Sequence, residues 1–140
     1  MRVYISGVFD LFHYGHMKLI NKCREMFKND TLIIGICSDN DCIDYKRKPI
    51  LSMKERLESL KAFNIGDEYI ENAPIIETED FYKENRIDKT IHAHTLEDHD
   101  YYVSNYYSYA DKNNMLVRLE YTKSISTTDI INRIFNIKNN

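Results

Sequence analysis

The chain alternates short apolar segments with amphipathic segments, and this alternation constrains the fold more than any other feature of the sequence. Apolar runs rich in β-branched residues are typical of strands buried inside a sheet. The expected strands occupy residues 2–8, 31–38, 68–72, 89–94 and 115–121. Because strands separated by helices pair in parallel through right-handed crossovers, we predict an α/β fold with a doubly wound, five-stranded, mainly parallel sheet.

Helices are expected between these strands and after the last of them. They occupy residues 16–27, 52–63, 77–85 and 124–137. Ser52 and Glu55 have the spacing of a capping box, and Ser126 and Asp129 repeat that spacing before the last helix. Only residues 98–114 show no obvious element.

The length of 140 residues favours one domain with a single core. No internal repeat and no linker rich in Pro, Gly or Ser divides the chain. We therefore expect one domain over residues 1–136 and a short tail over residues 137–140. No apolar run approaches the roughly 20 residues of a membrane span, and the first residues do not resemble a secretory signal.

Charge and cysteine content limit the function classes. The formal net charge of -3 at pH 7 argues against general binding of nucleic acid or of a membrane surface, because neither polyanion would be attracted. Cys23, Cys37 and Cys42 are odd in number and lack metal-type spacing. They are expected to be free thiols in a reducing compartment, which indicates the cytoplasm.

Two histidines lie where the first strand is followed by the first helix. Ligands of such sheets bind at this edge, and the three-residue spacing turns His13 and His16 toward one side. Gly15 removes a side chain so that a ligand can approach the backbone, and amides at a helix start attract anions. These features favour a phosphate site. Surface histidines remain an alternative, and a metal site is disfavoured because no third ligand lies nearby in the sequence.

The longer segment GVFDLFHYGH resembles the H-x-G-H signature of the nucleotidyltransferase superfamily, and specifically its cytidylyltransferase branch. Later segments are similar to further motifs of choline-phosphate and ethanolamine-phosphate cytidylyltransferases, and they follow in the same order. These segments are YKRKPILSMKER, ENAP, RIDKTIHAH and SISTTDIINRI. The resemblance covers about residues 3 to 135.

The resemblance implies a Rossmann-like nucleotidyltransferase fold and a defined reaction. A phosphate oxygen of a small phospho-alcohol attacks the α-phosphorus of CTP and expels pyrophosphate. Phosphocholine or phosphoethanolamine is the favoured acceptor, with glycerol 3-phosphate next, so the implied setting is the synthesis of phospholipid precursors. The resemblance further implies Mg²⁺ that arrives with CTP, and a homodimer.

The resemblance also assigns roles to individual residues. His13 and His16 stabilise the transition state on the CTP phosphates, Lys46 is the catalytic lysine of a mobile loop, and Arg56 contacts the nucleotide. Without the resemblance, His16 could be a helix cap, and Lys46 and Arg56 could be surface charges. The other implied nucleotide-binding residues are Gly7, Val8, Phe9, Asp10, Gly15, His92, Ser126, Thr127 and Thr128. Asp10 is expected to order the histidine turn.

The closing motif and the fourth strand depart from the family pattern. Tyr121 stands where the family has an arginine, and the loss of a guanidinium is costly at a phosphate site. Residues of a strand alternate between faces, so Lys123 would share the face of Tyr121 and could supply the charge. After His92, Ala93 and His94 replace acidic residues that help to hold choline in the choline-phosphate enzymes.

These departures leave alternatives open. A tyrosine cluster within residues 101–109 could be helix packing, a dimer contact or an aromatic cage for a methylated ammonium. Its members are Tyr101, Tyr102, Tyr106, Tyr107 and Tyr109. The competing functions are a catalytically inactive relative that still binds a nucleotide and an adenylyltransferase of the same superfamily.

Overall fold

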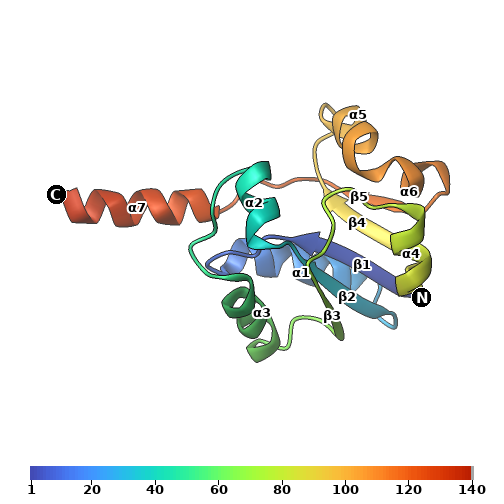
Figure 1. Ribbon diagram of the computed structural model, residues 1–140, viewed down its shortest axis with the longest axis horizontal. Coiled ribbons are helices and arrows are strands. Elements are labelled where there is room, and N and C mark those ends of the chain that lie inside the picture. Colours follow the sequence, from blue (N-terminus) through green and yellow to red (C-terminus); the bar gives the residue numbers. More distant parts are fainter. Residues whose placement is uncertain (140) are drawn as a thin grey trace.

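A parallel five-stranded sheet forms the centre of the computed structural model, which describes residues 1–139 (Figure 1). The strand order is β3-β2-β1-β4-β5, and every neighbouring pair is parallel. The strands are β1 (Arg2–Gly7), β2 (Thr31–Ile36), β3 (Glu68–Glu71), β4 (Lys89–Ala93) and β5 (Leu116–Leu119). The predicted α/β fold is therefore confirmed.

Eight helical segments connect and follow the strands in the described part of the chain. They are α1 (Tyr14–Met26), α2 (Asp39–Tyr45), α3 (Met53–Ala62), α4 (Glu79–Asn85), α5 (His99–Tyr102), η1 (Val103–Tyr107), α6 (Ser108–Lys112) and α7 (Thr127–Asn139). The two capping boxes predicted from the sequence are both present, at Ser52 with Glu55 and at Ser126 with Asp129.

Two parts of the helical structure differ from the sequence-based expectation. Residues 98–114, for which no element was expected, form the consecutive helices α5, η1 and α6. Helix α2 was also missed, because its sequence is mostly polar and only its buried residue Cys42 packs inward. The tail expected for residues 137–140 continues α7 through Asn139, and residue 140 lies outside the described residues.

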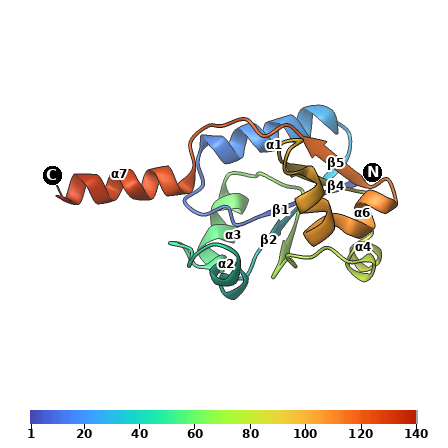
Figure 2. The same ribbon diagram turned by 90° about the horizontal axis from the view of Figure 1, so that it is seen from above.

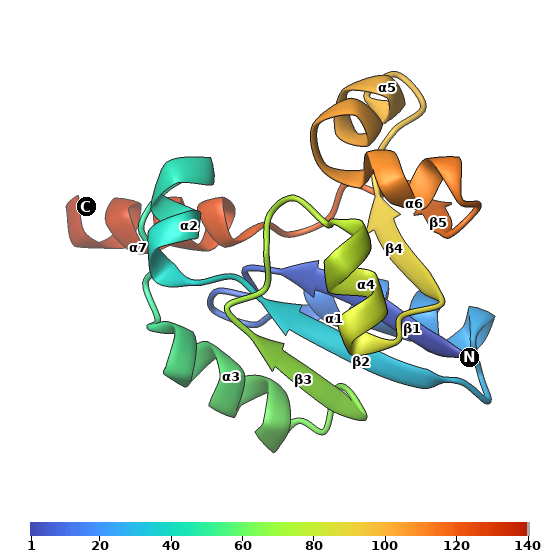
Figure 3. The ribbon, with the colours of Figure 1, turned by 45° about the vertical axis from the view of Figure 1, so that its right-hand side comes forward.

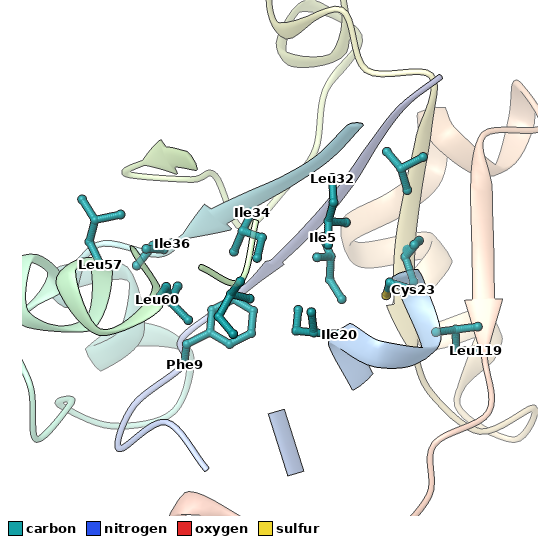
Figure 4. Packing of buried hydrophobic residues seen from close by; sticks show 13 residues of the cluster. Ile5, Phe9, Ile20, Cys23, Leu32, Ile34, Ile36, Leu57, Leu60 and Leu119 are labelled. Carbon is teal, nitrogen blue, oxygen red and sulfur yellow. The ribbon is translucent and has the colours of Figure 1, made fainter. Parts of the chain in front are cut away.

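Helices cover both faces of the sheet because strand side chains alternate between the faces. On one face, Ile5 and Ile34 pack with Ile20 of α1 and Leu60 of α3 (Figure 4). The opposite face carries a separate cluster that packs against α4 and α6. Its buried members are Tyr4, Ile33, Tyr82, Ile87 and Ala110.

The order of the sheet reverses between β1 and β4, because β2 follows β1 on one side and β4 lies on the other. Such a switch point opens a crevice at the carboxyl ends of the strands. Figure 3 shows α2 on the side to which the arrowheads of β1 and β2 point, and α5 beyond the arrowhead of β4. Helix α7 projects away from the sheet in both Figure 1 and Figure 2.

The three cysteines are buried and free, as predicted. Burial raises the pKa of Cys23 and of Cys37 to about 12, so these thiols stay protonated and unreactive at neutral pH. Within residues 1–139, no helix has the length and apolar character that a membrane crossing requires.

Candidate active site at the carboxyl edge of the sheet

A cavity of about 340 Å³ opens at the switch point between β1 and β4, and we call it the first cavity. Its walls come from the segment after β1, the exposed side of α1, the segment after α2 and residues 120–127. Predicted site residues that line it are Gly7, Val8, Phe9, Asp10, His13, Gly15, His16, Lys46, His92, Tyr121, Ser126 and Thr127. Arg56, Lys123 and Thr128 do not line it.

His13 and His16 form a reciprocal capping box at the start of α1. His13 Nδ1 accepts a hydrogen bond from the Gly15 N–H at 3.1 Å, and His16 Nδ1 accepts one from the His13 N–H at 3.2 Å. The two rings stack with their centroids 3.8 Å apart. Because each Nδ1 is an acceptor, each neutral ring carries its proton on Nε2. The capping role considered for His16 is therefore real, and it leaves an N–H donor on each ring.

The donor of His13 already has a protein partner in this structure. His13 Nε2 lies 3.3 Å from Thr127 Oγ1, and that hydroxyl donates to the Asp10 carbonyl oxygen at 2.9 Å. This chain of hydrogen bonds runs in one direction only if His13 Nε2 carries the proton. It also joins the start of α7 to the histidine turn, so two segments that are distant in sequence converge at one point.

Both histidines are neutral at pH 7. Burial lowers the pKa of His16 to about 4, with a smaller contribution from His13, and burial also lowers the pKa of His13. The neutral rings contribute N–H donors but no positive charge. The positive charge of the cavity therefore comes from other side chains.

That charge comes from four basic side chains. Lys46 and Arg47 follow α2, and Lys18 and Lys22 lie one turn apart on α1. Lys22 Nζ lies 3.3 Å from Thr122 Oγ1, beside Tyr121. We did not predict Lys18 and Lys22 from the sequence, although their i, i+4 spacing on the helix that starts at the histidine pair is a usable signal.

Asp10 orders a different segment from the one expected. Its buried carboxylate accepts hydrogen bonds from the Ile50 and Leu51 amides at 2.7 and 2.9 Å, so it fixes the segment after Lys46. The flanking Phe9 and Leu11 have φ values of 54° and 48°, in the left-handed region that non-glycine residues rarely adopt. Such strain is common at functional turns, and here it directs the Asp10 carboxylate inward.

The structure adds a second reason for a glycine at position 15. A Cβ atom at this position would lie 2.7 Å from the Ile125 carbonyl oxygen. The glycine therefore permits close approach of the chain's own closing segment, which brings Ser126 and Thr127 to the cavity.

Arg56 is fully buried and acts as a connection between loops. Its guanidinium donates to the carbonyl oxygens of Val8, Cys37 and Leu51 at 2.7, 2.9 and 3.2 Å, and to Asp39 Oδ1 at 2.7 Å. These partners follow β1 and β2 and precede α3. The predicted contact between Arg56 and a nucleotide stays a prediction, and the alternative of a surface charge is wrong.

The expectation that Tyr121 and Lys123 share one face of a strand is wrong. Strand β5 ends at Leu119, so residues 121–123 do not alternate as strand residues do. Tyr121 is 54 % exposed and lines the first cavity, whereas Lys123 is exposed and does not line it. The basic side chain next to this segment is that of Lys22.

A second cavity of about 140 Å³ adjoins the first and shares part of its wall. Its aromatic lining consists of Tyr45, Tyr102, Tyr106 and Tyr107 together with His92. The ring centroid of His92 lies 4.6 Å from that of Tyr102 and 5.0 Å from that of Tyr107. Part of the predicted tyrosine cluster therefore surrounds a space, and Tyr45 joins it from α2.

Comparison with known proteins identifies what this arrangement resembles. The family model described as cytidylyltransferase-like matches residues 4–133. Choline-phosphate cytidylyltransferase 2 of Arabidopsis thaliana is 35% identical over 135 residues, and the match covers 96% of this chain and 44% of that protein. Choline-phosphate cytidylyltransferase of Saccharomyces cerevisiae is 37% identical over 138 residues, with 96% and 31% covered.

Two more matches extend the comparison. Ethanolamine-phosphate cytidylyltransferase of Arabidopsis thaliana is 35% identical over 141 residues, covering 96% of this chain and 32% of that protein. The chain thus spans less than half the length of these curated relatives. The lipopolysaccharide core biosynthesis protein from Thermoplasma volcanium GSS1 has a similar structure, with a TM-score of 0.66 over 88% of this chain and 98% of that one. Its sequence identity is 19%, so this likeness supports the fold alone.

Proposed function

The chain belongs to the cytidylyltransferase-like family, and on that premise we propose that it transfers CMP from CTP to a small phospho-alcohol and releases pyrophosphate. The observation that carries this proposal is the first cavity at the carboxyl edge of the sheet, which His13, His16 and Lys46 line together. The similarity to choline-phosphate and ethanolamine-phosphate cytidylyltransferases supports the same reaction.

The chemistry requires alignment and charge stabilisation more than proton transfer. A phosphate oxygen of the acceptor forms a bond to the α-phosphorus, and the bond from that phosphorus to the bridging oxygen breaks, so pyrophosphate leaves with the electron pair. Negative charge collects on the phosphoryl oxygens. The Nε2–H group of His16 donates to these oxygens, and that of His13 does so by exchanging its contact with Thr127 Oγ1 for one of them. Lys46 and Arg47 neutralise the charge of the CTP phosphates.

We assign the charge that replaces the family arginine to α1. Lys18 and Lys22 line the first cavity beside Tyr121, whereas Lys123 does not line it. A lysine is a point charge without the bidentate geometry of a guanidinium, so two lysines together are a reasonable replacement for one arginine.

Mg²⁺ belongs to the proposal as part of the substrate. No group of three or more His, Cys, Asp or Glu residues within the described part of the chain could hold a metal ion. The buried carboxylate of Asp10 is already engaged by two backbone amides. These residues do not form a metal cage, and we therefore expect the ion to enter bound to the CTP phosphates.

The second cavity supports an amino-alcohol phosphate as the acceptor. Tyrosine faces attract an ammonium group, and an acceptor bound there would have its phosphate near the first cavity, because the two cavities share part of their wall. We therefore favour phosphocholine or phosphoethanolamine over glycerol 3-phosphate.

The proposal includes a homodimer in the cytoplasm. Ile134 and Ile137 of α7 are 57 % and 76 % exposed, and exposed apolar side chains on one helix support association. The free cysteines fit a reducing compartment. Light scattering coupled to size-exclusion chromatography measures the mass directly.

The test is pyrophosphate release from CTP or ATP with phosphocholine, phosphoethanolamine or glycerol 3-phosphate. We expect release with CTP and at least one of these acceptors. Release with ATP alone would favour an adenylyltransferase, and release with neither nucleotide would favour a binding protein without catalytic activity.

A further inference from the structure

A buried carboxyl lies directly behind the wall of the second cavity. Glu77 precedes α4 and is 2 % exposed. Its backbone N–H donates to the Tyr106 carbonyl oxygen at 3.1 Å, so the residue is fixed to the segment that lines the cavity. Its carboxyl accepts hydrogen bonds from the Tyr82 hydroxyl and, at 2.8 Å, from Thr90 Oγ1.

Glu77 has no cationic partner within the described residues. None of the ion pairs formed by residues 1–137 includes it. An unpaired buried carboxylate is costly, and burial raises the pKa of Glu77 to about 7. Hydrogen bonds from Tyr82, Thr90 and Ser6 oppose this rise in pKa. Hydrogen bonds therefore stabilise the charged form of Glu77, although no positive charge among the described residues pairs with it.

Two residues that contact Glu77 also line the second cavity. Ser6, whose hydroxyl interacts with the Glu77 carboxyl, lines both cavities. Tyr106, bonded to the Glu77 backbone, lines the second cavity as well. The described lining of that cavity contains four tyrosines and no Asp, Glu, Lys or Arg. Glu77 therefore offers a carboxylate in contact with the wall of a cavity whose described lining is uncharged.

We propose that Glu77 is a specificity-determining residue whose carboxylate, acting through the cavity wall, selects acceptors with a cationic alcohol group over neutral ones. This inference rests on the proposed function, since it concerns the acceptor of that reaction. The tyrosine faces attract an ammonium at short range. A carboxylate behind them adds a field that water screens poorly in a buried setting. Glu77 thus takes the place of the acidic residues that Ala93 and His94 replace.

The inference predicts a pH dependence with a definite sign. The titratable groups that face Glu77 are Tyr4 of β1, Cys37 after β2, Tyr82 of α4 and Tyr107 of η1. The pKa of each of these groups is raised, so all stay neutral between about pH 6 and 8. Glu77 gains its charge as the pH rises through about 7, so the preference for a cation increases in that direction.

The lining histidine does not interfere with this dependence. Burial lowers the pKa of His92 to about 4, so its ring stays neutral over the same range. His94, which follows β4, and His99 beyond it form a hydrogen-bonded series with His92.

The experiment compares two acceptors that differ only in charge: phosphocholine and 3,3-dimethylbutyl phosphate. We expect the wild-type protein to show a KM about tenfold lower for phosphocholine, and Glu77→Gln to lose most of this ratio while kcat and the KM for CTP change little. Tyr82→Phe is the matched control. It removes one of the hydrogen bonds that stabilise the carboxylate, so the rise of the ratio moves to higher pH, but the ratio reached at high pH is retained.

The pH dependence of the KM ratio is measured on the wild-type protein alone. It therefore tests the inference even if Glu77→Gln fails to fold. The ratio of the two KM values rises from about pH 6 to 8, and ionisation of the acceptor phosphate cancels because both compounds carry it. A ratio that is unchanged in Glu77→Gln, or that does not vary with pH, overturns the inference.

Failure of the inference is distinguishable from failure of the proposed function. If the wild-type protein turns over neither compound with CTP, the proposed function fails. Calorimetric binding of the same two phosphates to the wild-type protein and to Glu77→Gln then decides the role of Glu77, because binding does not depend on turnover.

Discussion

His13 and His16 each use one imidazole for two tasks. Nδ1 caps the start of α1 and leaves Nε2 as an N–H donor, and both residues line the first cavity. The H-x-G-H spacing predicts a phosphate site from the sequence, but the capping box becomes visible only in the structure. A sequence pattern does not tell which ring nitrogen binds the backbone.

The two tasks can be separated by His13→Asn. Asparagine is a favourable N-cap residue, so the helix start is retained while the Nε2 donor is lost. We expect kcat to fall roughly one hundredfold or more, as for the loss of a donor to a developing oxyanion, while the melting temperature changes little. Steady-state kinetics and thermal unfolding measure both. A large loss of stability with unchanged kcat would mean that His13 acts only as a cap.

The neutral state of the histidines is a second prediction at this scale. In the free protein we expect His16 and His92 to titrate near pH 4, well below the usual value for histidine, because burial disfavours the charged ring. Ring carbon and nitrogen chemical shifts followed by NMR give each midpoint. Midpoints at or above about 6.5 would contradict the account.

At the scale of elements, the strands and the long helices could be predicted because apolar periodicity and caps mark them. Helix α2 and the run from α5 to α6 could not, since their short polar or tyrosine-rich sequences have no clear period. The missed elements are those that build the second cavity, because Tyr45 lies on α2 and Tyr102 on α5.

Lys18 and Lys22 lie on a helix that lines the first cavity, whereas Lys123 lies in the segment after β5. Substitution of these lysines tests which of them bind the nucleotide. We expect Lys22→Ala and Lys18→Ala each to raise the KM for CTP about tenfold, as for a lost charge-assisted hydrogen bond. Lys123→Ala is the matched control, because Lys123 does not line the cavity. A large effect of Lys123→Ala with none at α1 would restore the hypothesis that the sequence alone suggested.

At the scale of the whole molecule, Arg56 joins the loops on which the first cavity depends. Its side chain is fully buried, and its donors reach carbonyl oxygens after β1, after β2 and before α3. The sequence placed Arg56 on a capped helix but could not show the direction of its side chain, because a helical arginine is most often exposed.

We expect Arg56→Lys to lower the free energy of unfolding by about 2 kcal/mol or more, since a lysine cannot reach all these acceptors and leaves buried carbonyls unpaired. Arg24→Lys is the matched control, because Arg24 forms an exposed ion pair with Asp67. Urea denaturation measures both variants. Equal effects would mean that the buried network of Arg56 contributes no more than a surface pair.

The most direct test of the central claim is a crystal structure of the protein with bound CTP. The account predicts that oxygens of the α-phosphate lie within hydrogen-bonding distance of His13 Nε2 and His16 Nε2, with Lys46 beside the phosphate chain. A nucleotide bound outside the first cavity, or phosphates turned away from both imidazole rings, would contradict it.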